Sequence, residues 1–95
     1  MSEEVKASHI LVKTKEEALE IKEEILAGKS FEEAAKEYSL CPSSRNGGDL
    51  GYFGRNVMVL EFDHAAFEAP IGEITNPINT NFGWHLILVT DKKTN

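Results

Sequence analysis

The segment VKASHILV, residues 5–12, predicts a β-strand inside a sheet. Ala7 and His9 fall on one face of an extended chain, while Ile10 and Val12 fall on the other. Both faces are therefore apolar toward the middle of the segment. This pattern favours a central strand over an edge strand, so the rest of the sheet is expected to form on both sides of it.

A second long strand is expected near the other end of the chain, over residues 84–90. Its side chains also alternate, and His85 shares one face with two aliphatic neighbours. Residues 74–78 predict a short strand, which Pro77 makes an edge or interrupted strand because proline has no N–H to donate. The turn-forming residues 80–83 join the two strands, which must therefore be antiparallel.

Helices are predicted between these strands. Thr14 with Glu17 and Ser30 with Glu33 form capping-box patterns, which satisfy free backbone N–H groups at the start of a helix. Apolar residues recur at helical spacing after each box. A third apolar stripe, over residues 62–69, ends before a proline and predicts one more helix.

The longest irregular stretch is residues 41–54, which contain one proline, two serines and four glycines. This composition predicts a loop, and loops of this length in small domains are often functional. The order of elements is therefore strand, two helices, loop, helix and two strands. One sheet with helices packed against it is the simplest arrangement, which gives an α+β fold in a single domain over residues 1–95.

The composition argues against several classes of partner. The 95 residues carry a net charge of −6, whereas nucleic acids and anionic membrane surfaces attract basic faces. No apolar run approaches the roughly 20 residues that a membrane helix needs, and the acidic first residues are unlike a signal peptide. The single cysteine, Cys41, excludes an internal disulfide and suits a reducing compartment. We therefore expect a cytoplasmic domain.

Two of the three histidines, His9 and His85, lie in the middle of predicted strands. They are equally consistent with two core histidines that have separate partners. If the two strands are neighbours, however, the imidazoles can bond each other, one as donor and one as acceptor. Such a pair would fix the tautomer of each ring and place a rigid polar centre beneath a site.

Cys41 allows three interpretations from the sequence. It can be an inert buried thiol, a polar group in a cleft, or the nucleophile of a hydrolase, which would need a nearby histidine and an oxyanion hole. Local sequence around Cys41 carries no protease signature. Cys41 and the three histidines also lack the spacing of zinc ligands, so we expect neither a metal nor another cofactor.

Several strings occur in a consistent order over about residues 5–90, and together they carry a resemblance. They are ASHILVK (residues 7–13), YSLCPS (38–43), GGDLGYF (47–53), AAF (65–67), GEI (72–74) and FGWHLI (82–87). The chain resembles the parvulin family of peptidyl-prolyl cis-trans isomerases, most closely the minimal stand-alone parvulins of microbes. The resemblance implies an FKBP-like four-stranded antiparallel sheet surrounded by helices, in the order β-α-α-(α)-β-α-β-β.

The resemblance also implies roles for four polar residues. His9 and His85 match the family's paired histidines, and Cys41 falls where the family has a cysteine or aspartate facing the substrate. Thr80 matches a hydroxyl that hydrogen-bonds near the histidines. These four residues form the predicted catalytic set.

A proline-binding pocket is implied at four further positions. Leu50, Met58 and Phe62 match the apolar pocket that holds the proline ring, and Phe82 matches its rim. Some parvulins clamp phosphate with an arginine-rich insertion after the first strand, but residues 13–17 contain no arginine and lead directly into a helix. The resemblance therefore implies a monomeric isomerase with no phosphate requirement, acting on proline-containing unfolded or extended polypeptides. A chaperone module that binds such peptides with little turnover is the alternative.

Overall fold

The computed structural model describes residues 3–94, which form four strands, three α-helices and one 3-10 helix. In chain order these elements are β1 (Glu3–Val12), α1 (Lys15–Leu26), α2 (Phe31–Tyr38), η1 (Pro42–Asn46), β2 (Asp49–Gly54), α3 (Leu60–Glu68), β3 (Ile78–Thr80) and β4 (Gly83–Thr94). The strands make one antiparallel sheet in the order β2-β1-β4-β3. The predicted α+β class and four-stranded sheet are confirmed.

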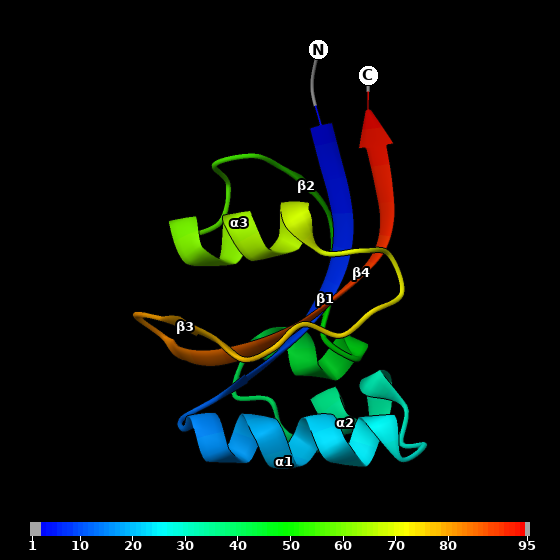
Figure 1. The fold of residues 1–95 in the computed structure, drawn as a ribbon, viewed down its shortest axis with the longest axis vertical. Helices are drawn as coiled ribbons and strands as arrows, with labels where there is room; N and C mark the ends of the chain where they lie inside the picture. The colour runs from blue at the N-terminus through cyan, green and yellow to red at the C-terminus, as the bar shows by residue number, and fades with distance from the viewer. Residues whose placement is uncertain (1–2, 95) are drawn as a thin grey trace.

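Strand β1 lies inside the sheet, as its two apolar faces predicted. It pairs with β4 along its whole length, from Glu3 opposite Thr94 to Val12 opposite Trp84. On its other side it pairs with the shorter β2, and this pairing ends where Ser8 meets Asp49. Figure 1 shows β1 and β4 as two long neighbouring strands at the centre of the molecule.

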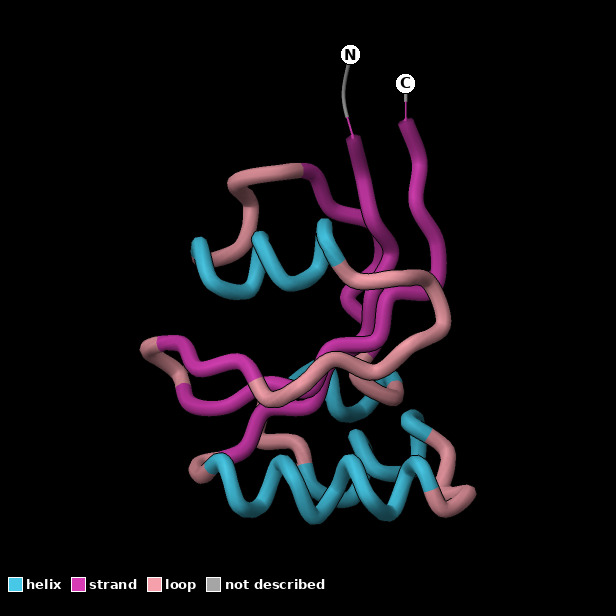
Figure 2. Tube along the Cα trace, in the orientation of Figure 1, coloured by secondary structure: helices cyan, strands magenta, loops and turns pink. Residues whose placement is uncertain are grey.

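The sheet separates two hydrophobic clusters, as the alternation along β1 and β4 requires. The cluster on the α3 side comprises Val5, Ala7, Phe53, Phe62, Ala66, Phe67, Ala69, Ile87 and Val89. The cluster beneath α1 and α2 comprises Ile10, Val12, Ala18, Ile21, Phe31, Ala34, Ala35 and Leu86. Figure 2 shows α3 on one side of the strands and the two N-terminal helices on the other.

Both predicted capping positions begin helices. The hydroxyl of Thr14 accepts the N–H of Glu17 at 3.1 Å, and the hydroxyl of Ser30 accepts the N–H of Glu33 at 3.0 Å. These hydrogen bonds satisfy N–H groups that the helix itself leaves free. No helix within residues 3–94 is both long enough and apolar enough to span a membrane.

The structure corrects two local expectations. The stretch 41–54 is not one loop, because it contains η1 and the edge strand β2. Glycines disfavour strands in isolation, but here the backbone of β2 is held by pairing with β1. The strand expected at 74–78 is also wrong in extent: Ile74 makes only an isolated bridge to Leu88, and β3 begins at Ile78, just after the proline.

Candidate active site

The central strands place two histidine rings side by side. His9 on β1 and His85 on β4 lie on the same face of the sheet, since Leu11 is opposite His85 and His9 is opposite Ile87. Their Nδ1 atoms are 3.1 Å apart, and their ring planes are inclined by only 17°. Both side chains are buried, with 5% and 4% of their surface exposed. The structure thus selects the shared pair over two separate core histidines.

Thr80, at the end of β3, extends this pair into a chain of hydrogen bonds. Its Oγ1 lies 2.7 Å from His85 Nε2 and accepts the backbone N–H of Phe82 at 3.1 Å. Within residues 3–94 the Thr80 hydroxyl has no other hydrogen-bond partner, so its proton is best placed on the bond to His85. His85 Nδ1 then donates to His9 Nδ1, and His9 keeps its proton on Nε2.

The histidine pair is held in the neutral state. Burial, and next the neighbouring His85, lower the pKa of His9 from 6.5 to about 4. Burial also lowers the pKa of His85. Among the described residues His9 Nε2 has no hydrogen-bond partner, which leaves a proton there without an acceptor. At neutral pH the pair is therefore a polar but uncharged group.

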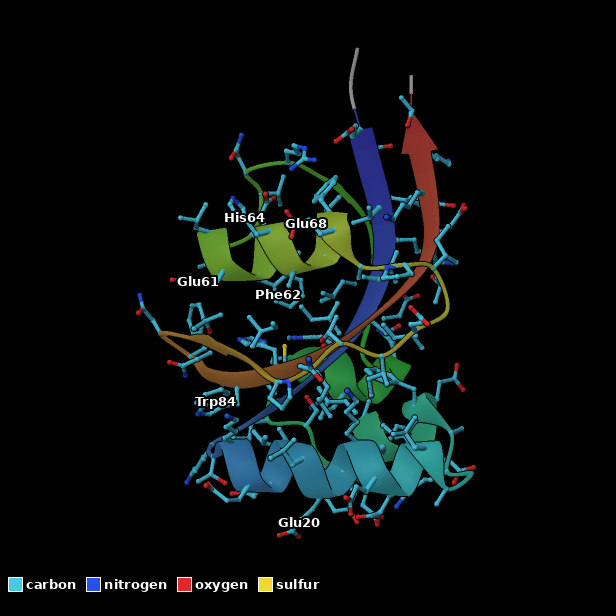
Figure 3. The ribbon with its side chains drawn as sticks, in the orientation of Figure 1. Glu20, Glu61, Phe62, His64, Glu68 and Trp84 are labelled. Atoms are coloured by element: carbon cyan, nitrogen blue, oxygen red, sulfur yellow. The ribbon has the colours of Figure 1, made fainter. Side chains whose placement is uncertain are left out.

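An apolar pocket of about 520 Å³ opens above the histidines. It is lined by His9, Leu11, Leu40, Cys41, Pro42, Leu50, Val57, Met58, Val59, Phe62, Phe82 and His85. Phe62 stands edge-on to both imidazoles, with ring centroids 5.4 Å from His9 and 5.3 Å from His85. Figure 3 shows Phe62 on the side of α3 that faces β3, whereas His64 and Glu68 project from the opposite side.

A tight backbone contact holds the segment before β2 against the histidine strand. The carbonyl of Gly48 accepts the N–H of His9 at 3.0 Å. Gly48 has a φ of +84°, and a Cβ atom there would lie 2.4 Å from the carbonyl oxygen of His9. Only glycine fits this conformation and this approach. Gly48 thus fixes where β2 begins, and this places Leu50, the second residue of β2, beside the histidine pair.

Comparisons with known proteins agree with this geometry. The model of the PPIC-type PPIase domain family matches residues 1–93. The chain belongs to this family.

The relatives of this PPIase domain include long and short proteins. The foldase protein PrsA of Geobacillus kaustophilus is 49% identical over 90 residues, which are 94% of this chain and 32% of that protein. The chain thus spans about a third of the length of such relatives. The crystal structure of PrsA from Bacillus anthracis superposes with a TM-score of 0.95 at 47% identity, covering 98% of this chain and 43% of that one. The parvulin NmPin of Nitrosopumilus maritimus superposes with a TM-score of 0.86 at 41% identity, covering 96% and 99%.

The PPIase domain brings together the site residues named from the sequence. His9, Cys41, Leu50, Met58, Phe62, Phe82 and His85 all line the pocket, and Thr80 bonds His85 beneath it.

Sequence reasoning missed five pocket residues. They are Leu11, Leu40, Pro42, Val57 and Val59. For Leu40, Val57 and Val59 the available signal was an aliphatic side chain in a segment that has no helical or strand period. For Leu11 it was the place on the same strand face as His9. Within residues 3–94, no three His, Cys, Asp or Glu side chains gather closely enough to hold a metal ion.

Proposed function

We propose that this domain catalyses the cis–trans isomerisation of X-Pro peptide bonds in unfolded or extended polypeptides. The observation that carries this proposal is an apolar pocket whose floor is a buried, uncharged histidine pair. Membership of the PPIase family and the match to stand-alone parvulins over almost their whole length support it.

The physical task explains why such a pocket suits the reaction. Rotation about the X-Pro bond breaks amide resonance against a barrier of about 18–20 kcal/mol, so the uncatalysed exchange takes tens to hundreds of seconds. The twisted amide has lost much of the charge separation between nitrogen and oxygen. A low-polarity pocket therefore stabilises the twisted form relative to the planar one, and each 1.4 kcal/mol of difference speeds the reaction about tenfold.

The proposed roles of the residues follow from their places. Leu50, Met58 and Phe62 hold the proline ring, and Phe82 covers it at the rim. The preceding carbonyl then swings past Cys41. No bond is broken, so no nucleophile is required, and the part of Cys41 is electrostatic or steric.

The histidines form the floor of the pocket and do not shuttle protons. His9, His85 and Thr80 make a continuous chain of hydrogen bonds. Because Phe62 stands edge-on to both rings, this hydrogen-bonded network orders one of the side chains that contact the proline. Because rotation needs no proton transfer, the neutral pair has a positioning function in this proposal.

The substrate is expected to be apolar before the proline and free of phosphate. Leu40, Val57 and Phe82 are 57%, 66% and 69% exposed on the pocket wall, which offers apolar contacts to the preceding residue. Glu61, in the first turn of α3, adds a negative charge on the side of the helix that carries Phe62 (Figure 3). This carboxylate disfavours acidic and phosphorylated peptides.

The test combines turnover with specificity. NMR exchange spectroscopy on X-Pro peptides, with and without phosphate, should show exchange accelerated by catalytic amounts of protein and greater for unphosphorylated peptides. Refolding of a protein limited by proline isomerisation should also be accelerated. Suppression of aggregation without either acceleration would instead establish the peptide-binding chaperone. A monomeric state and a cytoplasmic location remain predictions, which gel filtration and fractionation of the source cells would check.

A further inference from the structure

Ser39 makes an unusual double contact at the end of α2. Its hydroxyl oxygen accepts the backbone N–H of Leu11 at 3.1 Å and the backbone N–H of Cys41 at 3.3 Å. One side chain thus joins the histidine strand β1 to the segment that carries the pocket cysteine. The serine belongs to the string YSLCPS, but the sequence assigns it no contact; it directly follows the last residue of α2.

The double contact replaces a missing strand. Pairing between β1 and β2 ends at Ser8, so the edge of β1 beyond that point has no neighbouring strand on that side. The Ser39 hydroxyl accepts the N–H of Leu11, and the N–H of Leu40 donates to the carbonyl of Leu11 at 2.8 Å. Both backbone groups of Leu11 are therefore satisfied by residues 39 and 40, as a paired strand would satisfy them.

Three of the residues tied by these bonds belong to the pocket wall. Leu11, Leu40 and Cys41 all line the pocket, and Leu11 follows His9 by two positions on the same strand. The backbone of Cys41 is fixed on one side by Ser39 and on the other by η1, where its carbonyl accepts the N–H of Ser44 at 2.9 Å. The position of Cys41 relative to His9 thus depends on the Ser39 hydroxyl together with the backbone bond from Leu40 to Leu11.

We infer that Ser39 is a positioning residue, whose hydroxyl holds the Leu40–Cys41 wall of the pocket at a fixed place against the histidine strand. The inference rests on the proposed isomerase function for its catalytic consequence. Without the hydroxyl, two N–H groups lose their acceptor and the wall can shift. The carbonyl that swings past Cys41 would then meet a less well placed surface. Since this contact matters most in the twisted state, kcat should fall more than KM changes.

The test compares Ser39→Ala with two matched variants. Ser39→Thr keeps the hydroxyl, and Ser30→Ala removes another serine hydroxyl that accepts a backbone N–H, at the start of the same helix and outside the pocket. Ser39→Ala should lower kcat by on the order of tenfold and change KM by less than about twofold. Ser39→Thr should stay within about twofold of the wild type, and Ser30→Ala should retain wild-type kcat despite its lower stability.

A second readout does not depend on catalysis. Cys41 is the only cysteine, so alkylation of the folded protein by iodoacetamide reports on this segment alone. Ser39→Ala should change the alkylation rate severalfold, while Ser39→Thr and Ser30→Ala should not. This arm tests the positioning role even if the wild type proves not to isomerise X-Pro bonds.

The outcomes are decisive in each direction. Wild-type kcat together with wild-type alkylation in Ser39→Ala would overturn the inference, and so would equal losses in Ser39→Ala and Ser30→Ala. If Ser39→Ala does not fold, amide hydrogen exchange in the wild type decides. The N–H groups of Leu11 and Cys41 should be protected to a similar degree, and rapid exchange at both would contradict the inference.

Discussion

Acid should destabilise this domain as the pH falls below about 6.5, because the buried histidine pair must stay neutral. Burial and the neighbouring His85 lower the pKa of His9 from 6.5 to about 4 in the folded protein. The unfolded chain therefore binds a proton that the folded chain excludes. The stability that the neutral form confers is fully present above pH 6.5 and is lost progressively as the pH falls toward 4.

The two pKa values of His9 give the size of the effect. Between pH 7.5 and pH 5, protonation of the unfolded chain at this one residue lowers the free energy of unfolding by about 2 kcal/mol. Well below pH 4, where His9 is protonated in both states, the loss in the free energy of unfolding levels off at about 3 kcal/mol. Burial lowers the pKa of His85 too, which adds in the same direction. A loss of this size is a large part of the roughly 5–15 kcal/mol that stabilises a typical domain.

Urea unfolding at a series of pH values from 7.5 to 5.0 measures this dependence. The wild type should lose about 1 kcal/mol of unfolding free energy per pH unit near pH 5.5 through His9 alone. His9→Gln should flatten this slope, even if it is less stable at every pH. An unchanged slope in His9→Gln would refute the reasoning.

Three further predictions concern the pocket. Thr80→Val keeps the side-chain shape but leaves His85 Nε2 without its hydroxyl partner, so the free energy of unfolding should fall by about 1–3 kcal/mol. In the wild type the ¹⁵N shifts should show Nδ1–H on His85 and Nε2–H on His9. In Thr80→Val the ¹⁵N shifts of both rings should change. Phe82→Ala should raise KM for X-Pro peptides without changing the urea midpoint, while Leu26→Ala, at a side chain with the same 69% exposure on α1, should change neither. Cys41→Ser should retain measurable isomerase activity in the NMR exchange assay, since rotation needs no nucleophile, and complete loss would contradict the non-covalent route.

The regular elements could be predicted because their signals are local. Alternation marked β1 and β4, and the hydroxyls of Thr14 and Ser30 marked the starts of α1 and α2. Strand β2 gave no such signal, since its glycines disfavour strands and its structure depends on pairing with β1. Only the resemblance to parvulins implied a fourth strand, and it placed no boundaries on it.

Most residues of the site could be predicted from the sequence, but their arrangement in space could not. The alternation put His9 and His85 on particular faces of their strands, yet the contact between their rings depends on the register of β1 against β4. That register includes a bulge after Lys6, which no local pattern reveals. The hydrogen bond from the N–H of Leu11 to the hydroxyl of Ser39 could not be predicted either, because it joins two segments that are 28 residues apart in the sequence.

The burial that makes the domain acid-sensitive is also what the proposed reaction requires. A pocket selects the twisted amide only if its surroundings favour the less polar form, and a charged imidazolium beneath it would favour the planar, more polar amide. The lowered pKa values of His9 and His85 keep that charge away at neutral pH. Protonation of the folded pair would therefore place a charge under the proline and force the donor and acceptor roles along the chain to Thr80 to rearrange at the same time. In the proposed mechanism, stability and activity should thus depend on the same neutral state of the histidine pair.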